Sequence, residues 1–256
     1  MTWDLRLGDC LDPVTGLASL PGKSVDVVIT DPPYGQAIYD TYKNVGKSEK
    51  ERRFNRDGDF RYMSGWEGID PYVAPLCAQF ERVARRWVVV FSDEEAAFLW
   101  RSAMGEWFIR FGAWMRQPVS LTPCQPARGF EAITVGHPRG INRRWNGGQN
   151  RAAVYFDRNL TGGAAALERH GHPCPKPVSL MEALVRDFTD PGELILDPFG
   201  GSGTTGVAAI RLGRRFIGWE RDPKYHAVAT KRLAGTREQT DLFRPKAPKA
   251  KQGVLL

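Results

Sequence analysis

A glycine-rich turn in the last quarter of the chain constrains the fold more than any other segment. It reads Asp197-Pro-Phe-Gly-Gly-Ser-Gly-Thr-Thr205 and follows an apolar strand expected at residues 193–196. A helix to about residue 212 and a strand at 215–219 come next, and Glu220 ends that strand. This order of elements forms half of a nucleotide-binding α/β unit. Glu220 lies 20 residues after Gly200, a spacing that suits an acceptor for ribose hydroxyls.

The rest of the chain alternates strands and helices in the same way. Strands are expected at 3–7, 24–30, 87–92, 107–116 and 131–136, and helices at 13–19, 70–86, 93–104 and after Pro177. This alternation predicts a doubly wound α/β sheet. The length of 256 residues fits one domain. We expect it to span residues 1–237, with polar insertions at about 35–68 and 137–163 as the candidate target-recognition region. A basic, disordered tail is expected at 238–256.

The glycine turn favours a ligand without phosphate. It lacks the G-x-G-x-x-G spacing of dinucleotide sites, and the chain has no G-x-x-x-x-G-K-[ST] pattern for a nucleoside triphosphate. Asp197 would repel a pyrophosphate but could attract an ammonium group. A ligand that carries ribose and an α-amino acid suits these charges, and S-adenosylmethionine is such a ligand.

A second rigid turn, Asp31-Pro32-Pro33-Tyr34, follows the apolar run at 24–30. Consecutive prolines cannot continue a central strand, so the turn must lie at the strand's carboxyl end. The Asp31 carboxylate and the Pro32 carbonyl could accept both protons of a base's exocyclic amine, and Tyr34 could stack on a flipped base. With a reference pKa of about 3.9, aspartate is a poor base for a neutral amine, so we expect orientation and charge stabilisation. The alternative is a proline-stiffened turn without catalytic function.

Together these motifs resemble the β group of DNA amino-methyltransferases, in which the catalytic motif precedes the cofactor motif. Residues 31–34 match the family's D-P-P-Y motif, and residues 197–205 match its D-P-F-x-G-S-G-T-T loop. The resemblance implies a Rossmann-like fold with a mixed seven-stranded sheet and helices on both faces. It also implies that the strands bearing Asp31 and Asp197 lie side by side, and that the 107–116 and 131–136 strands form an antiparallel end.

The resemblance also assigns residues to the cofactor. His172-Pro-Cys-Pro-Lys-Pro177 is similar to the family's H-P-x-x-K-P segment, whose lysine helps to hold the methionine end of the cofactor. Gly8-Asp9 matches an acid near the cofactor adenine. Trp219, before Glu220, departs from the smaller residue of many relatives and could alter the adenine pocket. The expected cofactor-binding residues are Asp9, Lys176, Asp197, Phe199, Gly200, Gly201, Ser202, Gly203, Thr204, Thr205 and Glu220.

The charge balance favours a polyanionic partner. Thirty-six Lys and Arg against 29 Asp and Glu give a net charge of +7. The basic loop with Trp145 and Tyr155 interleaved is a candidate DNA surface. Its alternative is a solvated basic loop. The candidate DNA-binding residues are Arg139, Arg143, Arg144 and Arg151.

The four cysteines form no C-x-x-C pair, which indicates a reducing cytoplasm rather than a disulfide frame. His170, His172 and Cys174 could be metal ligands, but no second ligand cluster exists, and we expect no metal. No apolar run approaches the ~18 residues that cross a bilayer, and the N-terminus lacks a secretory pattern. A membrane location is therefore not expected.

The favoured activity is N6-adenine methylation of duplex DNA with S-adenosylmethionine. N4-cytosine methylation needs the same hydrogen-bond geometry, but such relatives more often begin the motif with serine. RNA and protein-glutamine methyltransferases generally place the cofactor loop first. A non-catalytic DNA-binding subunit would be expected to lose Asp31, Tyr34, Gly201 or Glu220, and a nicotinamide oxidoreductase lacks its phosphate loop here. The resemblance also makes a homodimer an expectation, whereas a restriction endonuclease partner is not specified.

Overall fold

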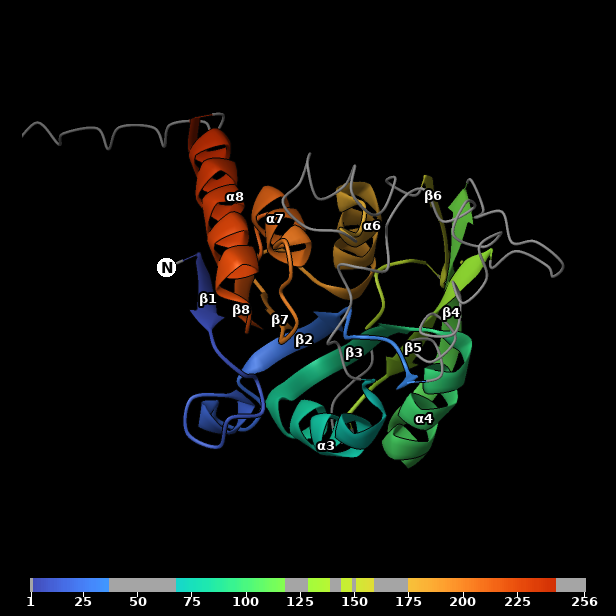
Figure 1. The fold of residues 1–256 in the computed structure, drawn as a ribbon. Helices are drawn as coiled ribbons and strands as arrows, with labels where there is room; N and C mark the ends of the chain where they lie inside the picture. The colour runs from blue at the N-terminus through green and yellow to red at the C-terminus, as the bar shows by residue number, and fades with distance from the viewer. Residues whose placement is uncertain are drawn as a thin grey trace, which may run out of the picture.

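The computed structural model describes residues 2–36, 68–117, 129–138, 144–148, 151–158 and 175–242. An eight-stranded sheet forms the centre of the molecule, in the order β1-β8-β7-β2-β3-β5-β4-β6 (Figure 1). The strands are β1 (Trp3–Leu7), β2 (Val25–Thr30), β3 (Ala84–Ser92), β4 (Phe108–Gln117), β5 (Phe130–Gly136), β6 (Val154–Arg158), β7 (Leu194–Asp197) and β8 (Arg215–Glu220). The strand count is one more than expected, but the α/β class is confirmed.

Strand directions follow the expectation from the resemblance. β1, β8, β7, β2 and β3 pair in parallel, and β2 and β7 are direct neighbours. β5 pairs antiparallel with both β3 and β4, and β6 pairs in parallel with β4 at the edge. The carboxyl ends of β2, β7 and β8 therefore meet at one edge of the sheet, where ligands bind in open α/β sheets.

Helices cover both faces of the sheet. On one side lie α6 (Val178–Phe188), α7 (Thr204–Arg211) and α8 (Pro223–Leu242), and on the other α3 (Val73–Val83) and α4 (Glu94–Met104) (Figure 1). Short 3₁₀ helices span Leu17–Ser19, Asp70–Tyr72 and Gly105–Trp107. The two faces carry separate apolar clusters, as a three-layer α/β domain requires.

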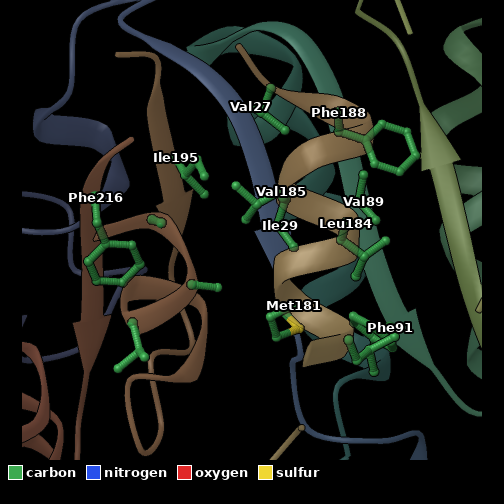
Figure 2. Packing of buried hydrophobic residues seen from close by; sticks show 14 of the residues in the cluster. Val27, Ile29, Val89, Phe91, Met181, Leu184, Val185, Phe188, Ile195 and Phe216 are labelled. Atoms are coloured by element: carbon green, nitrogen blue, oxygen red, sulfur yellow. The ribbon is translucent and has the colours of Figure 1, made fainter. Parts of the chain in front are cut away.

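Helix α6 shows how the sequence pattern becomes packing. Leu180, Leu184 and Phe188 recur every four residues, and all three are buried. All three belong to the same apolar cluster, and Leu184 and Phe188 point toward β2 and β3 (Figure 2). Each fully buried side chain of this kind contributes about 1.5–3 kcal/mol. This face fixes the start of α6, and with it the preceding Lys176, against the sheet.

Four features of the secondary structure differ from the sequence expectation. The region 13–19 contains only a single 3₁₀ turn, because Asp12 accepts the backbone N–H groups of Val14 and Thr15 and forms a turn instead. β3 begins at Ala84, inside the helix expected at 70–86. β6 was not predicted. α8 continues to Leu242, so the expected disordered tail begins inside a helix.

Several expectations fall outside the described residues. These are most of the 35–68 insertion, much of the 137–163 insertion, the His170–Cys174 cluster, and the tail from residue 243 on.

Candidate active site

The two predicted turns lie at neighbouring strand ends. Asp31 directly follows β2 and Asp197 ends β7, and these strands pair through Val28 and Leu196. The Thr30 hydroxyl donates to Oδ1 of Asp197 at 2.7 Å, and the Thr205 hydroxyl donates to Oδ2 at 2.6 Å. The Asp197 carboxylate therefore joins the end of β2 to the start of α7. The expected side-by-side placement of the two motifs is confirmed.

Asp197 is occupied by the protein itself. Besides the two threonines, the backbone N–H of Phe199 donates to Oδ1 at 3.1 Å. Burial raises the pKa of Asp197 to about 6, although these three hydrogen bonds oppose the shift. A carboxylate has about four acceptor positions, so most are taken. The Asp197 side chain therefore connects the end of β2 with the glycine turn and α7. Direct binding of a cofactor ammonium stays a prediction.

The glycine turn is held by the strand beside it. The Gly200 N–H donates to the Trp219 carbonyl at 2.7 Å, and the Gly201 N–H donates to Oε2 of Glu220 at 2.8 Å. Gly203 precedes α7 with a φ of 79°, a left-handed conformation that favours glycine. A side chain at Gly200 would lie 3.0 Å from the Trp219 carbonyl. This close packing explains why glycines fill the turn.

Other members of the predicted turn have structural contacts. Phe199 is half-buried and packs against the α3 and α4 side of the core. The Ser202 carbonyl accepts a bond from Arg232 at 2.6 Å, and the Ser202 and Thr204 hydroxyls lie 3.2 Å apart. These bonds tie the turn to α8 and to its own helix. The turn is thus rigid before any ligand binds.

Glu220 and Asp9 lie near the carboxyl ends of the neighbouring strands β8 and β1. Leu7 of β1 pairs with Glu220 of β8, and the Gly8 N–H donates to the Glu220 carbonyl at 3.0 Å. Burial raises the pKa of the Glu220 carboxyl, while bonds from the backbone N–H groups of Asp222 and Gly201 oppose that shift. Asp9 is exposed and accepts the Leu11 N–H at 2.8 Å. Two acids therefore lie at or just beyond the ends of neighbouring strands.

Trp219 belongs to the core. Its ring is 1% exposed, and its indole N–H donates to the Thr15 carbonyl at 3.2 Å. The Arg6 guanidinium lies 4.9 Å from the ring centroid. The larger residue therefore fills the interior beside β1 and holds the 9–20 loop.

Lys176 lies at the catalytic motif. Its Nζ donates to Oδ2 of Asp31 at 2.7 Å and lies 3.1 Å from Oε2 of Glu131 on β5. Burial would lower the pKa of the ammonium, but the charges of Asp31 and Glu131 raise it above its usual value. Lys176 is therefore a cation bound to two acids. An ammonium has three N–H groups, so contact with a cofactor carboxylate stays a prediction.

Asp31 has one oxygen in use and one without a partner. Lys176 binds Oδ2, whereas the buried Oδ1 has no hydrogen-bond partner among the described residues. Burial raises the pKa of Asp31, Lys176 opposes this, and Glu131 adds to it. The side chain as a whole keeps 25% of its surface exposed. A hydrogen-bond donor that enters the site can therefore bind to Oδ1 of Asp31.

Glu131 was not among the predicted site residues. Its side chain is 5% exposed, and Arg116 of β4 lies 3.2 Å from Oε1. The Tyr34 hydroxyl also bonds to this carboxylate, and burial, Glu131 and Asp31 together raise the pKa of Tyr34. A single acid within a stretch rich in arginine was a signal in the sequence, but only the β4–β5 pairing brings it to Asp31.

Of the arginines predicted to bind DNA, the two that the structure describes, Arg144 and Arg151, contact acids away from this site. Arg144 lies beside the start of β3, where its carbonyl accepts bonds from Arg86 and the Trp87 indole, and its side chain lies 3.5 Å from Asp190. This is the opposite edge of the sheet from Asp31. Arg151 lies 2.9 Å from Asp187 of α6. Arg139 and Arg143 fall outside the described residues.

The two aromatic residues of that loop, Tyr155 and Trp145, pack against the protein core. Tyr155 is 4% exposed on β6, and its hydroxyl donates to Oδ2 of Asp187 at 2.8 Å. Trp145 is partly buried and packs against the core near Phe188. The interpretation of Tyr155 as part of a nucleic-acid surface was wrong, because an unpredicted edge strand turns this side chain inward, whereas the same interpretation of Trp145 stays a prediction.

Three further features of the described ranges concern metal ligands, cysteines and membrane-spanning helices. There, no three His, Cys, Asp or Glu side chains meet as metal ligands. Cys10 and Cys77 are buried free thiols, and burial raises the pKa of each to about 12. Among the helices that the structure describes, none combines the length and the apolar composition that crossing a bilayer requires.

The fold and the paired turns define the class: an α/β protein with the Rossmann-like methyltransferase architecture. Comparison with known proteins agrees. Residues 137–231 match the N6/N4 methyltransferase family model, described as DNA methylase. The match agrees with the resemblance that the motifs indicate, so this part of the chain is similar to DNA methylases of the N6/N4 type.

Two curated relatives cover most of the chain. A protein of Escherichia coli (strain K12) named as a methylase, YubD, is 29% identical over 266 residues, which cover 94% of this chain and 97% of the relative. The DNA adenine methyltransferase YhdJ of the same organism is 25% identical over 252 residues, 87% of this chain and 80% of the relative.

Solved structures share the fold. The M1.HpyAVI–SAM complex aligns with a TM-score of 0.63 and 22% identity, over 90% of this chain and 98% of that one. The cytosine-N4-specific PvuII DNA methyltransferase aligns with a TM-score of 0.65 and 18% identity, over 94% and 93% of the two chains. Relatives of both base specificities are thus similar to this protein.

Proposed function

We propose that this protein transfers a methyl group from S-adenosylmethionine to the N6 amine of a flipped-out adenine in duplex DNA. One observation on the largely buried Asp31 carboxylate carries the proposal. Lys176 fixes its Oδ2, whereas its Oδ1 has no hydrogen-bond partner among the described residues. A buried acceptor without a donor costs free energy, so the site is built to be completed by an incoming N–H group.

The residues around the glycine turn suit the proposed cofactor. Asp9 and Glu220 supply acceptors at neighbouring strand ends for the adenine and ribose groups, and the glycines allow close approach of the backbone. A structural neighbour solved in complex with SAM supports this choice. When bound, the cofactor supplies an electrophilic methyl group on a sulfonium sulfur. The remaining N–H of Lys176 could bind its carboxylate.

The protein's own groups orient and stabilise the target amine. In the proposed complex, Asp31 Oδ1 and the Pro32 carbonyl accept the two amine protons, and Tyr34 stacks on the base. Methyl transfer makes the amine cationic, and the Asp31 carboxylate stabilises that charge. Because burial raises the pKa of Asp31, the carboxylate also accepts the released proton more readily than an exposed aspartate would.

Adenine is proposed over cytosine because the motif begins with aspartate at Asp31. The relative named as a DNA adenine methyltransferase supports this choice. N4-cytosine transfer is the second candidate, because the PvuII enzyme named as cytosine-N4-specific shares the fold. A non-catalytic subunit is disfavoured, since the charged groups of the site are all present.

The substitution Asp31→Ala tests the proposal. We expect it to abolish methyl transfer to unmethylated genomic DNA, while calorimetry gives a dissociation constant for S-adenosylmethionine within about threefold of wild type. Asp26→Ala is the matched control, since Asp26 is a buried acid at the opposite end of β2 and binds the Leu194 N–H and Arg85. Normal transfer by the folded Asp31→Ala variant would contradict the proposal.

A further inference from the structure

Glu131 is the centre of a charged cluster beside the catalytic turn. Its carboxylate contacts Arg116 at 3.2 Å, Lys176 at 3.1 Å and the Tyr34 hydroxyl. Lys176 in turn contacts Asp31 at 2.7 Å. Two acids and two bases therefore form a neutral set, which offsets the cost of burying each charge.

The position of Glu131 follows from strand register. Glu131 pairs with Trp114 across the antiparallel β4–β5 ladder, one step beyond the pair Ala113–Ala132. Ala132 pairs with Ser92, the last residue of β3, so Glu131 lies just past the carboxyl end of β3. The antiparallel end of the sheet thus delivers an acid to the edge where the parallel strands deliver Asp31.

The Lys176 ammonium is confined from several sides. It lies 5.2 Å from the ring of Phe91, and 5.7 Å from the rings of Tyr34 and Trp114. These rings lie within the range of a cation–π attraction. With Glu131 on one side, the ammonium has little freedom except toward Oδ2 of Asp31.

A second cluster of the same chemistry shows what a purely structural acid looks like here. Asp187 is 4% exposed and binds a buried tyrosine and an arginine, Tyr155 at 2.8 Å and Arg151 at 2.9 Å. Each of its oxygens has a partner. The Glu131 cluster differs because it ends on Asp31 Oδ1, which has none among the described residues.

We infer that Glu131 is a positioning residue of the methyl transfer, which holds Lys176 against Asp31 and fixes the Tyr34 hydroxyl. This inference rests on the proposed function and goes beyond it by assigning a role to a residue outside the two motifs. Glu131 orients Lys176 so that Asp31 keeps Oδ2 occupied and presents Oδ1 to the target amine. It also sets the tilt of the ring on which the base stacks.

The test compares Glu131→Gln with Asp187→Asn, which removes a matched charge from the structural cluster. We expect Glu131→Gln to lower kcat by about 10- to 100-fold, with KM for DNA and the dissociation constant for S-adenosylmethionine within about threefold. Both substitutions should lower the melting temperature by similar amounts, but Asp187→Asn should leave kcat within about twofold of wild type.

The pH profile separates positioning from loss of stability. The groups that face Asp31 are Lys176, Glu131, Tyr34 and Asp197, with Arg116 behind Glu131. The negative charge of Glu131 raises the pKa of Asp31, so its removal should shift the acid limb of kcat to lower pH. A merely destabilised protein would lose activity without this shift.

Each outcome is decisive. A wild-type kcat in folded Glu131→Gln overturns the inference but leaves the proposed function standing. The same holds if the pH midpoint of Glu131→Gln does not move and Asp187→Asn loses as much kcat. A wild-type protein that methylates no DNA overturns the proposed function and this inference with it. If Glu131→Gln does not fold, Glu131→Asp replaces it: the charge remains, so kcat should fall while the pH midpoint stays at the wild-type value.

Discussion

At the scale of single residues, Asp31 and Lys176 show how two motifs far apart in the chain become one site. The sequence predicted both residues but assigned them to different partners, the target base and the cofactor. Their 2.7 Å contact shows that they also form an ion pair with each other. The lysine fixes one oxygen of the Asp31 carboxylate. It also lowers the pKa of Asp31, which burial raises. Catalysis by a buried acid of this kind depends on that compensation.

Replacement of Lys176 by Met tests this compensation. Lys176→Met keeps much of the side-chain volume but removes the charge that lowers the pKa of Asp31. The pKa of Asp31 should rise, so a larger fraction is protonated at neutral pH. At saturating S-adenosylmethionine, we expect kcat at pH 7 to fall about 100-fold and the acid limb of its pH profile to shift to higher pH.

Lys176→Arg is the control, because it keeps the positive charge. It should leave the midpoint of the acid limb close to that of wild type. A shift of the Lys176→Met profile to lower pH would contradict the assigned role, since the sign would then be that of losing Glu131.

At the scale of elements, the Asp197 carboxylate bonds β2 to α7. Both hydroxyl donors, Thr30 and Thr205, are buried, and their bonds to Asp197 are 2.7 and 2.6 Å long. The ends of the catalytic strand and of the cofactor strand are therefore fixed together. These bonds explain why the two loops lie together at one edge of the sheet.

Thr205→Val tests this bond. Valine has a similar volume, but it leaves Asp197 Oδ2 without its donor, so we expect a loss of about 1–3 kcal/mol in the free energy of unfolding measured with urea. Thr134→Val is the matched control. The Thr134 hydroxyl is fully buried on β5 and has no hydrogen-bond partner in the described part of the chain, so valine there should be neutral or stabilising.

Equal free energies of unfolding for the two valine variants would show that the hydrogen bond between Thr205 and Asp197 does not stabilise the protein. A stability loss in Thr134→Val alone would also contradict it.

Elements differ in how far the sequence could predict them. β2, β7, β8 and the turns after them were predicted, because apolar β-branched runs and glycine or proline turns are local signals. β6 was not, because it is a short edge strand whose pairing with β4 depends on residues about 40 positions away. α8 was missed because few of its side chains are apolar, and it packs chiefly through Ala229 and Leu233.

The candidate site divides in the same way. Asp31, Tyr34 and the glycine turn could be found from motifs, since each motif is contiguous. Glu131 and its contact with Lys176 could not, because they depend on the register between β4 and β5. Arg144 was assigned by its charge, but its neighbours at the start of β3 lie at the far edge of the sheet.

At the scale of the whole molecule, the sheet order explains why the catalytic motif can precede the cofactor motif in the chain. β2 lies beside β7 in space although more than 160 residues separate the two turns. The surplus of seven positive charges remains consistent with a polyanionic partner. A homodimer stays a prediction.

The most direct test of the central proposal is nucleoside mass spectrometry of DNA after incubation with the protein and S-adenosylmethionine. Unmethylated genomic DNA should gain N6-methyladenine with wild type and none with Asp31→Ala. N4-methylcytosine in place of N6-methyladenine would contradict the choice of base. A folded wild-type protein that leaves no methylated base on the DNA would contradict the proposed function itself.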